Sequence, residues 1–170
     1  GARRYVRRIY EDTISRHKYQ SRPSCVMEPD VKEGVGGLRD YHAMLWAARA
    51  VLGIEAAEGL VSENMISSQE LRDLMRSVSF LWEVRTHLHR INHRKDDRLT
   101  FEAQEKLAAA LGFSTREGSL SAERFMQVFY LHSRNVQFIS ELFFQGLIKP
   151  EEKGVTVSLG NELEVRNGWL

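Results

Sequence analysis

Residues 28–40 contain the residue types that bind phosphate. Gly36 and Gly37 come directly before an expected helix, and Lys32 and Arg39 lie on either side of them. Glycines let backbone N–H groups approach an anion, and a helix N-terminus favours negative charge. Lys32 and Arg39 add cationic donors. The segment therefore predicts an anion site, and a turn that merely starts a helix is the alternative. It is not a P-loop, because no Gly-Lys-Ser/Thr ends it.

A second charged segment, residues 90–104, lies where a long expected helix ends. Arg94, Asp97 and Arg98 are its candidate phosphate-binding or ion-network residues. Basic residues near a helix C-terminus are also favourable with the helix dipole, and charge runs are usually solvated. These three residues are therefore weaker candidates for phosphate contact than those of residues 28–40.

Other reactive residue types do not form a recognisable catalytic or metal-binding set. His89 and His93 have the i, i+4 spacing that can share a metal, but the H-E-x-x-H pattern is absent. Cys25 lies in an expected loop without an assigned base, and the serines read as helix caps. We therefore predict no catalytic residue and no metal site in this chain.

Helical periodicity dominates the sequence. Apolar residues recur at three and four positions in five segments. These are residues 3–20, 37–52, 68–93, 101–111 and 122–145. Ser67 and Glu70 have capping-box spacing, and Gly146 and Pro150 are expected to end the last helix. Trp46 and Trp82 fall on the apolar stripes and are predicted to be core residues.

The pattern changes to strict alternation after residue 150. Val155–Leu159 and Leu163–Val165 alternate around Gly160 and Asn161, which is typical of a small hairpin. The predicted fold class is thus all-α, an antiparallel helical bundle of about five helices with a short β-hairpin-like C-terminal tail. The predicted domains are a helical domain over residues 1–150 and a strand-like linker over residues 151–170.

Composition and charge indicate the compartment and argue against membrane-spanning and nucleic-acid-binding proteins. The chain has 170 residues, of which 42% are apolar and 28% are charged, with one cysteine and a net charge of +1. One cysteine fits a reducing compartment, so we expect a cytoplasmic protein, and no apolar run predicts a membrane span. Residues 1–22 hold seven basic and two acidic residues. Nucleic-acid binding through this basic segment is unlikely at that overall charge. The chain begins with Gly1 rather than Met, as expected of a segment of a longer protein.

Four segments, in order, resemble the protein-PII uridylyltransferase/uridylyl-removing enzyme family. The first, E-P-D-V-K-E-G-V-G-G-L-R-D, is similar to the family's E-P-(D/N)-I-K-x-x-x-G-G-L-R-D and is followed by a match to L-x-W-x-A-R. The others resemble L-W-x-(V/I)-R-x-x-L-H, D/N-R-L-x-F-D-x-Q and, more weakly, E-x-(F/M)-M-x-x-Y-x. They lie at residues 28–49, 80–89, 97–104 and 123–130. Glutamine-synthetase adenylyltransferases share a looser version of the first motif.

The resemblance implies a place in a larger enzyme that transfers UMP from UTP to a tyrosine of the PII protein. It implies that this chain packs on an upstream nucleotidyltransferase domain, and that residues 151–170 are a linker that leads towards a downstream HD domain. The family's catalytic signature, Gly-Ser followed by Asp-x-Asp, is absent, so we expect the isolated chain to be inactive. No cofactor is implied in this chain, whereas Mg²⁺ with UTP is implied for the parent.

The resemblance also marks residues without fixing their roles. Lys32, Gly36, Gly37 and Arg39 are the candidates for nucleotide contact, and Asp40 would orient Arg39 or the turn. The marked residues could instead hold helix ends together. The alternative functions are a regulatory module that docks a protein such as PII, and a part of a different, adenylyltransferase-like enzyme.

Overall fold

The computed structural model describes residues 1–116, 118–148, 157–158 and 164–165. The described part is mostly helical, which confirms the all-α class. Its seven helices are α1 Ala2–Gln20, α2 Pro23–Met27, α3 Leu38–Leu52, α4 Gly59–Ser62, α5 Ser68–Asn92, α6 Phe101–Ala110 and α7 Ser121–Ile148. None of these described helices is both long enough and apolar enough to span a membrane.

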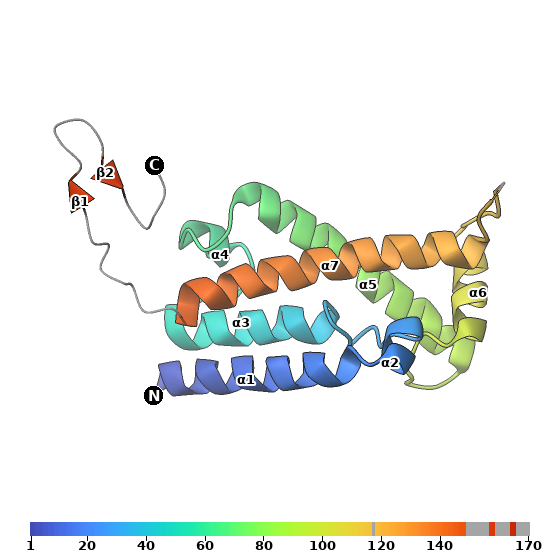
Figure 1. Cartoon of the computed structure of the whole chain (residues 1–170), viewed down its shortest axis with the longest axis horizontal. Coiled ribbons are helices and arrows are strands. Elements are labelled where there is room, and N and C mark those ends of the chain that lie inside the picture. Colours follow the sequence, from blue (N-terminus) through green and yellow to red (C-terminus); the bar gives the residue numbers. More distant parts are fainter. Residues whose placement is uncertain (117, 149–156, 159–163, 166–170) are drawn as a thin grey trace.

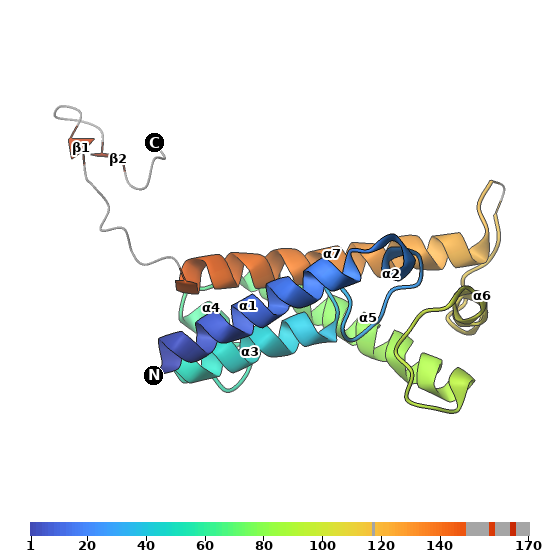
Figure 2. The ribbon, with the colours of Figure 1, turned by 60° about the horizontal axis from the view of Figure 1, so that its bottom comes forward.

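The long helices form one layered body (Figure 1). α1 lies along α3, and both pack against α7, so segments from the two ends of the helical region lie side by side (Figures 1 and 2). α5 packs against α7 and diverges from α1 towards the far end of the molecule, where α6 closes the space between α5 and α7 (Figure 2). The N-terminus of α1 and the C-terminus of α7 lie at the opposite end.

The count of about five helices is wrong for the described residues, because α2 and α4 fall outside the five segments predicted to be helical. α2 begins at Pro23, which suits the first helical position because its missing N–H group needs no partner there. α2 has five residues and α4 has four. Helices this short have too few turns to show an apolar periodicity.

Capping chemistry sets the ends of the longer helices. Ser67 accepts a hydrogen bond from the Glu70 N–H group, and the Glu70 carboxylate accepts one from the Ser67 N–H group, which confirms the capping box of α5. Gly53 follows α3 in the left-handed conformation at φ 69°. Gly146 does not end α7, because the helix continues to Ile148, two residues before Pro150. A Cβ atom built on Gly146 would lie 3.6 Å from the Met65 Cε atom.

The core is formed by the apolar stripes of α3, α5 and α7. Small buried residues of α3, such as Ala43 and Ala47, allow close approach of the neighbouring helices, while Leu81 of α5 and Phe143 of α7 fill the space between them. The prediction that Trp46 and Trp82 are core residues is wrong, because their side chains are 44% and 40% exposed. An indole is large enough to lie at the edge of an apolar stripe and still reach solvent.

The tail is described at only four positions. β1 (Val157–Ser158) pairs antiparallel with β2 (Glu164–Val165). The predicted turn at Gly160 and Asn161 lies outside the described residues, as does most of the predicted linker 151–170. The hairpin and the linker therefore stay predictions.

Candidate functional site

The segment 28–40 is a tight turn that Asp30 organises. Asp30 Oδ1 accepts hydrogen bonds from the backbone N–H groups of Lys32 and Glu33 at 2.8 and 2.6 Å. The Gly34 N–H group donates to the Asp30 carbonyl at 2.9 Å. An aspartate that binds the backbone two and three residues on stabilises such a turn locally. This turn delivers the chain into the N-terminus of α3.

The glycines of this turn are required by packing. Gly36 has φ +70°, and a Cβ atom built on it would lie 1.8 Å from the Ser133 carbonyl oxygen of α7. A Cβ atom on Gly37 would lie 2.7 Å from the Lys32 carbonyl oxygen. Both positions exclude any side chain, because the turn is pressed against α7 and against itself.

Asp40 occupies the anion position at the start of α3. Its side chain is fully buried and accepts hydrogen bonds from Arg16 Nη2 at 2.6 Å, from the Gly36 N–H group at 2.7 Å and from His17 Nε2 at 2.9 Å. Burial would raise the pKa of Asp40, but the hydrogen bond and charge of His17 and the charge of Arg16 outweigh it and hold that pKa below its ordinary value of 3.8. Asp40 thus ties α1 to the turn and to α3.

Backbone N–H groups at the α3 N-terminus already have acceptors within the chain. Those of Gly37, Leu38, Arg39 and Asp40 donate to carbonyl groups between Val31 and Gly37, and that of Gly36 donates to the Asp40 carboxylate. An external phosphate would therefore find these five amides engaged. Any contact of this segment with a nucleotide would depend on side chains that reach the surface.

Lys32 and Arg39 are the two candidates with half-buried, solvent-reaching side chains. Arg39 Nη2 donates to Glu33 Oε1 at 2.8 Å, and this hydrogen bond raises the pKa of Arg39 above its ordinary value. Burial opposes ionisation of Glu33, but the bond from Arg39 and the charges of Lys32 and Arg16 lower the pKa of Glu33 below 4.5. Lys32 Nζ lies 3.7 Å from Glu33 Oε1, too far for a hydrogen bond. Lys32 is therefore the less committed of the two cations.

The second predicted segment forms a similar cluster around Asp97. Arg85 donates to the Asp97 carboxylate through Nε at 2.7 Å and Nη2 at 3.1 Å, and His89 Nε2 lies 2.6 Å from Asp97 Oδ1. Burial would raise the pKa of Asp97, but the hydrogen bonds from Arg85 and His89 outweigh it and lower that pKa below 3.8. Asp97 therefore fixes the loop after α5 to the last turns of α5.

The structure joins the two segments to each other. The Val31 N–H group donates to the Asp97 carbonyl, and the Leu99 N–H group donates to the Pro29 carbonyl, both at 2.8 Å. The Glu28 carboxylate accepts from Arg98 Nη2 at 2.8 Å and from the first N–H group of α6, that of Phe101, at 3.1 Å. Residues that lie about 70 positions apart in sequence thus form one connected region.

The second-tier candidates do not converge on one point. Asp97 faces α5, whereas Arg98 reaches back to Glu28. Arg94 is exposed and pairs with the nearby Asp96 at 2.6 Å. The geometry gives all three internal partners, and the prediction that they contact a phosphate stays a prediction.

A partly exposed group of aromatic and arginine side chains includes Arg39, and the sequence analysis did not predict it. We define the Trp–Arg surface as Arg39, His42, Trp46, Trp82 and Arg85. The guanidinium of Arg39 lies 5.7 Å from the Trp46 ring centre, and that of Arg85 lies 5.2 Å from the Trp82 ring centre. His42 stacks on Trp46 at 5.9 Å and meets Trp82 edge-on at 6.3 Å. Together the contacts form a continuous chain from α3 to α5.

A signal for this surface was present in the spacing. Arg39, His42 and Trp46 follow each other at three and four positions, and so share one face of α3. Burial lowers the pKa of His42, and the positive charges of Arg39, Lys32 and Arg85 lower it further. Geometry links two of these cations to His42, because the tryptophan rings that the Arg39 and Arg85 guanidinium groups contact are the ones that His42 contacts.

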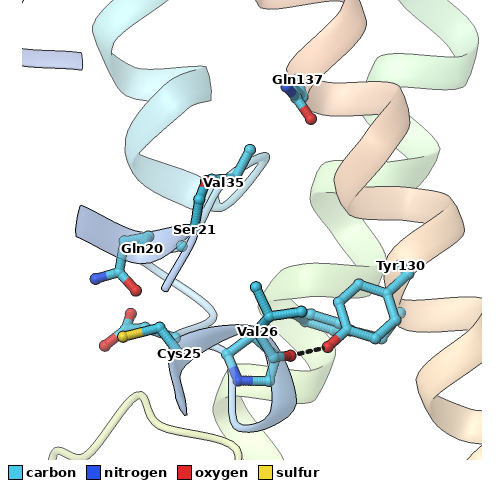
Figure 3. A pocket seen from close by; sticks show the side chains of 11 residues that line it. Gln20, Ser21, Cys25, Val26, Val35, Tyr130 and Gln137 are labelled. Carbon is cyan, nitrogen blue, oxygen red and sulfur yellow. Dashed lines mark hydrogen bonds between the residues drawn. The ribbon is translucent and has the colours of Figure 1, made fainter. Parts of the chain in front are cut away.

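A separate pocket of about 270 Å³ lies between the end of α1, α2, the turn and α7 (Figure 3). Gln20, Cys25, Asp30 and Gln137 contribute polar groups to its lining, and the Tyr130 hydroxyl donates to the Val26 carbonyl across one side. Burial and the charges of Asp97 and Glu33 raise the pKa of Asp30 above 3.8, against the opposing hydrogen bonds from the Glu33 and Lys32 N–H groups. No cationic side chain lines this pocket, so it does not resemble a phosphate site.

The described residues do not supply a metal centre. No group of three or more His, Cys, Asp and Glu side chains in this part of the chain is placed to hold a metal ion. The carboxylates of Asp40 and Asp97 are both engaged by an arginine and a histidine. The Mg²⁺ expected with UTP therefore does not fit these residues.

Comparison with known proteins identifies the family. A protein-family model described as GlnD PII-uridylyltransferase matches residues 4–144. The chain is 37% identical over 145 residues to a bifunctional uridylyltransferase/uridylyl-removing enzyme of Novosphingobium aromaticivorans, covering 85% of the chain and 16% of the relative. Enzymes of the same name from Cereibacter sphaeroides and Stutzerimonas stutzeri are 36% and 35% identical, over 84% and 92% of the chain and 15% and 18% of each relative.

No solved structure matches the chain at a significant level. The chain spans about a sixth of the length of the curated relatives it matches. The match over residues 4–144 includes all four motif segments, from the turn before α3 to the middle of α7. The chain belongs to the GlnD PII-uridylyltransferase family.

Proposed function

We propose that this chain is the helical part of a bifunctional uridylyltransferase/uridylyl-removing enzyme. In the parent it packs on the nucleotidyltransferase domain and helps to bind UTP or the PII protein. The observation that supports this is the arrangement of the family's motif segments. They build one rigid turn that is anchored through Asp40 and Asp97 and leaves Lys32 and Arg39 at the surface.

The parent reaction is UMP transfer from UTP to a tyrosine hydroxyl of PII, in a cytoplasmic enzyme of nitrogen regulation. Phosphoryl-type transfer depends on positioning and on neutralising charge on the phosphates. The Lys32 ammonium can act as a mobile point charge, whereas Arg39 presents a guanidinium already oriented by Glu33. Mg²⁺ bound with UTP would neutralise further phosphate charge, and residues outside the described part of the chain would hold it.

The test uses the full-length parent enzyme and two lysine variants. Lys32→Gln removes a charge-assisted contact worth about 1.5–3 kcal/mol, so kcat/KM for UTP should fall roughly 10- to 100-fold. Lys106→Gln is the control, because Lys106 is an exposed lysine of α6 whose salt bridge among the described residues is with Glu102, one turn away. Unchanged KM for UTP and unchanged turnover in the Lys32 variant would contradict the proposed site.

A second candidate function is protein docking without nucleotide contact. The surplus of basic residues on exposed α1 favours it, because a basic helix can meet an acidic partner surface. PII binding that survives Lys32→Gln but is lost on neutralising Arg7 and Arg8 would support this candidate. Measuring transfer from ATP beside UTP in the same assay tests the adenylyltransferase-like alternative.

A further inference from the structure

The pocket between the end of α1, α2, the turn and α7 takes no part in the proposed function (Figure 3). Its volume of about 270 Å³ is close to the lower limit of small-molecule sites, which is roughly 300 Å³, so the pocket suits a short ligand. The apolar part of its lining comes from α2, the turn and α7, and consists of Val26, Pro29, Val35 and Phe129. A ligand with a short carbon chain could therefore bury that chain here.

The polar groups of the lining are mainly hydrogen-bond acceptors, because their own protons are already used. The Tyr130 hydroxyl donates to a carbonyl of α2, and the Ser21 hydroxyl donates to a carbonyl of α1 at 2.8 Å. A hydroxyl whose proton is used in this way can only accept from a ligand. The Gln137 amide nitrogen donates to Glu141 Oε1 at 2.8 Å, so the amide oxygen is the atom left without a partner among the described residues.

Asp30 adds a carboxylate to these acceptors. Its Oδ1 atom accepts from the N–H groups of Lys32 and Glu33, whereas Oδ2 has no hydrogen-bond partner among the described residues. The described residues that line the pocket include no lysine, arginine or histidine. Two cations nearby in sequence contact other groups: the Arg22 guanidinium lies 4.4 Å from the Tyr19 ring centre, and Lys32 Nζ lies 3.7 Å from Glu33 Oε1. A matching ligand must therefore supply donors and a positive charge.

We propose that this pocket binds a small organic cation, an ammonium or guanidinium group on a short carbon chain. The cationic group pairs with the Asp30 carboxylate, further N–H groups donate to the acceptors of α1 and α7, and the chain packs against Val26 and Phe129. The cation comes either from a free molecule or from a lysine or arginine side chain elsewhere in the parent. The proposal does not depend on UTP binding, because none of the candidate nucleotide contacts lines the pocket.

Alkylation of Cys25 in the full-length parent tests this proposal, because Cys25 is a free thiol that lines the pocket and is partly exposed. Iodoacetamide modifies the thiol, and peptide mass spectrometry follows the rate at this residue alone. Butylammonium and butylguanidinium should slow the reaction several-fold and in a saturable way. Butanol and butyrate, at the same concentration and ionic strength, should leave the rate unchanged. The four compounds carry the same carbon chain, so the comparison isolates the charge and the donors.

Asp30→Asn removes the charge of the pocket while keeping the turn. Asparagine retains Oδ1 as the acceptor for the two backbone N–H groups and replaces Oδ2 with an uncharged donor. Protection of Cys25 should then need roughly 10- to 100-fold more butylammonium, because a charge-assisted contact is lost. Asp12→Asn, at an exposed position of α1, is the matched control and should not alter protection. Gln137→Met removes one acceptor at similar volume, should weaken protection less, and is the second variant if Asp30→Asn does not fold.

Two outcomes would support the proposal and distinguish the source of the cation. Slower alkylation only when a cation is added indicates a free ligand. Alkylation that is already slow, that added cations do not slow further, and that both Asp30→Asn and Gln137→Met accelerate indicates a basic side chain of the parent. Equal slowing by butanol or butyrate would overturn the proposal, as would no slowing by the cations together with unchanged rates in both variants. The measurement needs no turnover, so its outcome is independent of the Lys32→Gln assay.

Discussion

Two aspartate clusters, built from the same three residue types, hold two different parts of the helical body together. Each has one aspartate, one arginine and one histidine: Asp40 with Arg16 and His17, and Asp97 with Arg85 and His89. The Asp40 side chain is 0% exposed and joins α1 to α3, whereas that of Asp97 is 16% exposed and joins a loop to the helix before it. Because the ion pairs are alike, we expect the burial of the aspartate and the sequence separation of its partners to decide how much each cluster stabilises the fold.

The largest expected effect comes from neutralising the two aspartates. Asp40→Asn leaves the Arg16 and His17 side chains without their buried carboxylate, and should lower the free energy of unfolding by about 3–5 kcal/mol. Asp97→Asn should cost about 1–2 kcal/mol, because solvent reaches the cluster and replaces part of the lost interaction. Urea unfolding of both variants measures the difference. Asp73→Asn, on an exposed part of α5, is the control, and equal losses for Asp40 and Asp97 would break the comparison.

The second-largest expected loss of stability is at Gly36, whose N–H group donates to the Asp40 carboxylate. Gly36→Ala combines a left-handed backbone with a Cβ position 1.8 Å from a carbonyl oxygen of α7. Left-handed strain and overpacking together should cost about 3 kcal/mol. Gly53→Ala is a matched control, because Gly53 has nearly the same φ of +69° and nothing within 4 Å of the added Cβ atom. It should cost about 1–2 kcal/mol, and a similar loss at both sites would show that packing against α7 does not matter.

Acid should weaken the two clusters at the same end of the pH scale. The pKa values of Asp40 and Asp97 are both below 3.8 in the folded chain, so their stabilisation is complete above that pH and is lost as pH falls through the folded values. Asp40→Asn should therefore flatten the decline in unfolding free energy below pH 3.8. Urea midpoints measured from pH 7 to pH 2 would show it.

Asp30→Asn provides a control of opposite sign. The pKa of Asp30 is raised, so proton uptake by this carboxyl stabilises the fold as pH falls towards 3.8. Removing the carboxyl should make the loss of stability just above pH 3.8 steeper than in the parent sequence. A flatter curve in Asp30→Asn would contradict the assigned sign.

Local patterns made the long helices predictable, whereas the site depended on contacts distant in sequence. The capping pair Ser67 and Glu70 and the stripe containing Leu81 are encoded within a few residues of each other. The partners of Asp40 lie on α1, 23 and 24 residues away, and no local rule pairs them. Gly36 was predicted as an anion-binding glycine, but the space it needs is set by Ser133, almost 100 residues later. Spacing could have placed His42 and Trp46 on one face, but not beside α5.

The smallest expected effect is on the outer contacts of the Asp97 region, and it separates structural from functional roles there. Arg98 is 51% exposed in its pair with Glu28, so Arg98→Ala should lower the unfolding free energy by only about 0.5 kcal/mol. Glu28 keeps its second contact, the hydrogen bond from the Phe101 N–H group, which preserves the start of α6. Thermal unfolding of the variant measures the stability, and UTP kinetics of the full-length parent measure the function. If kcat/KM falls tenfold while the unfolding free energy changes by only this amount, Arg98 contacts a substrate as well as pairing with Glu28. If kcat/KM and the unfolding free energy both change only slightly, the role of Arg98 is to pair with Glu28. The Asp97 region then has a structural role like that of the Asp40 cluster, with a smaller contribution to stability.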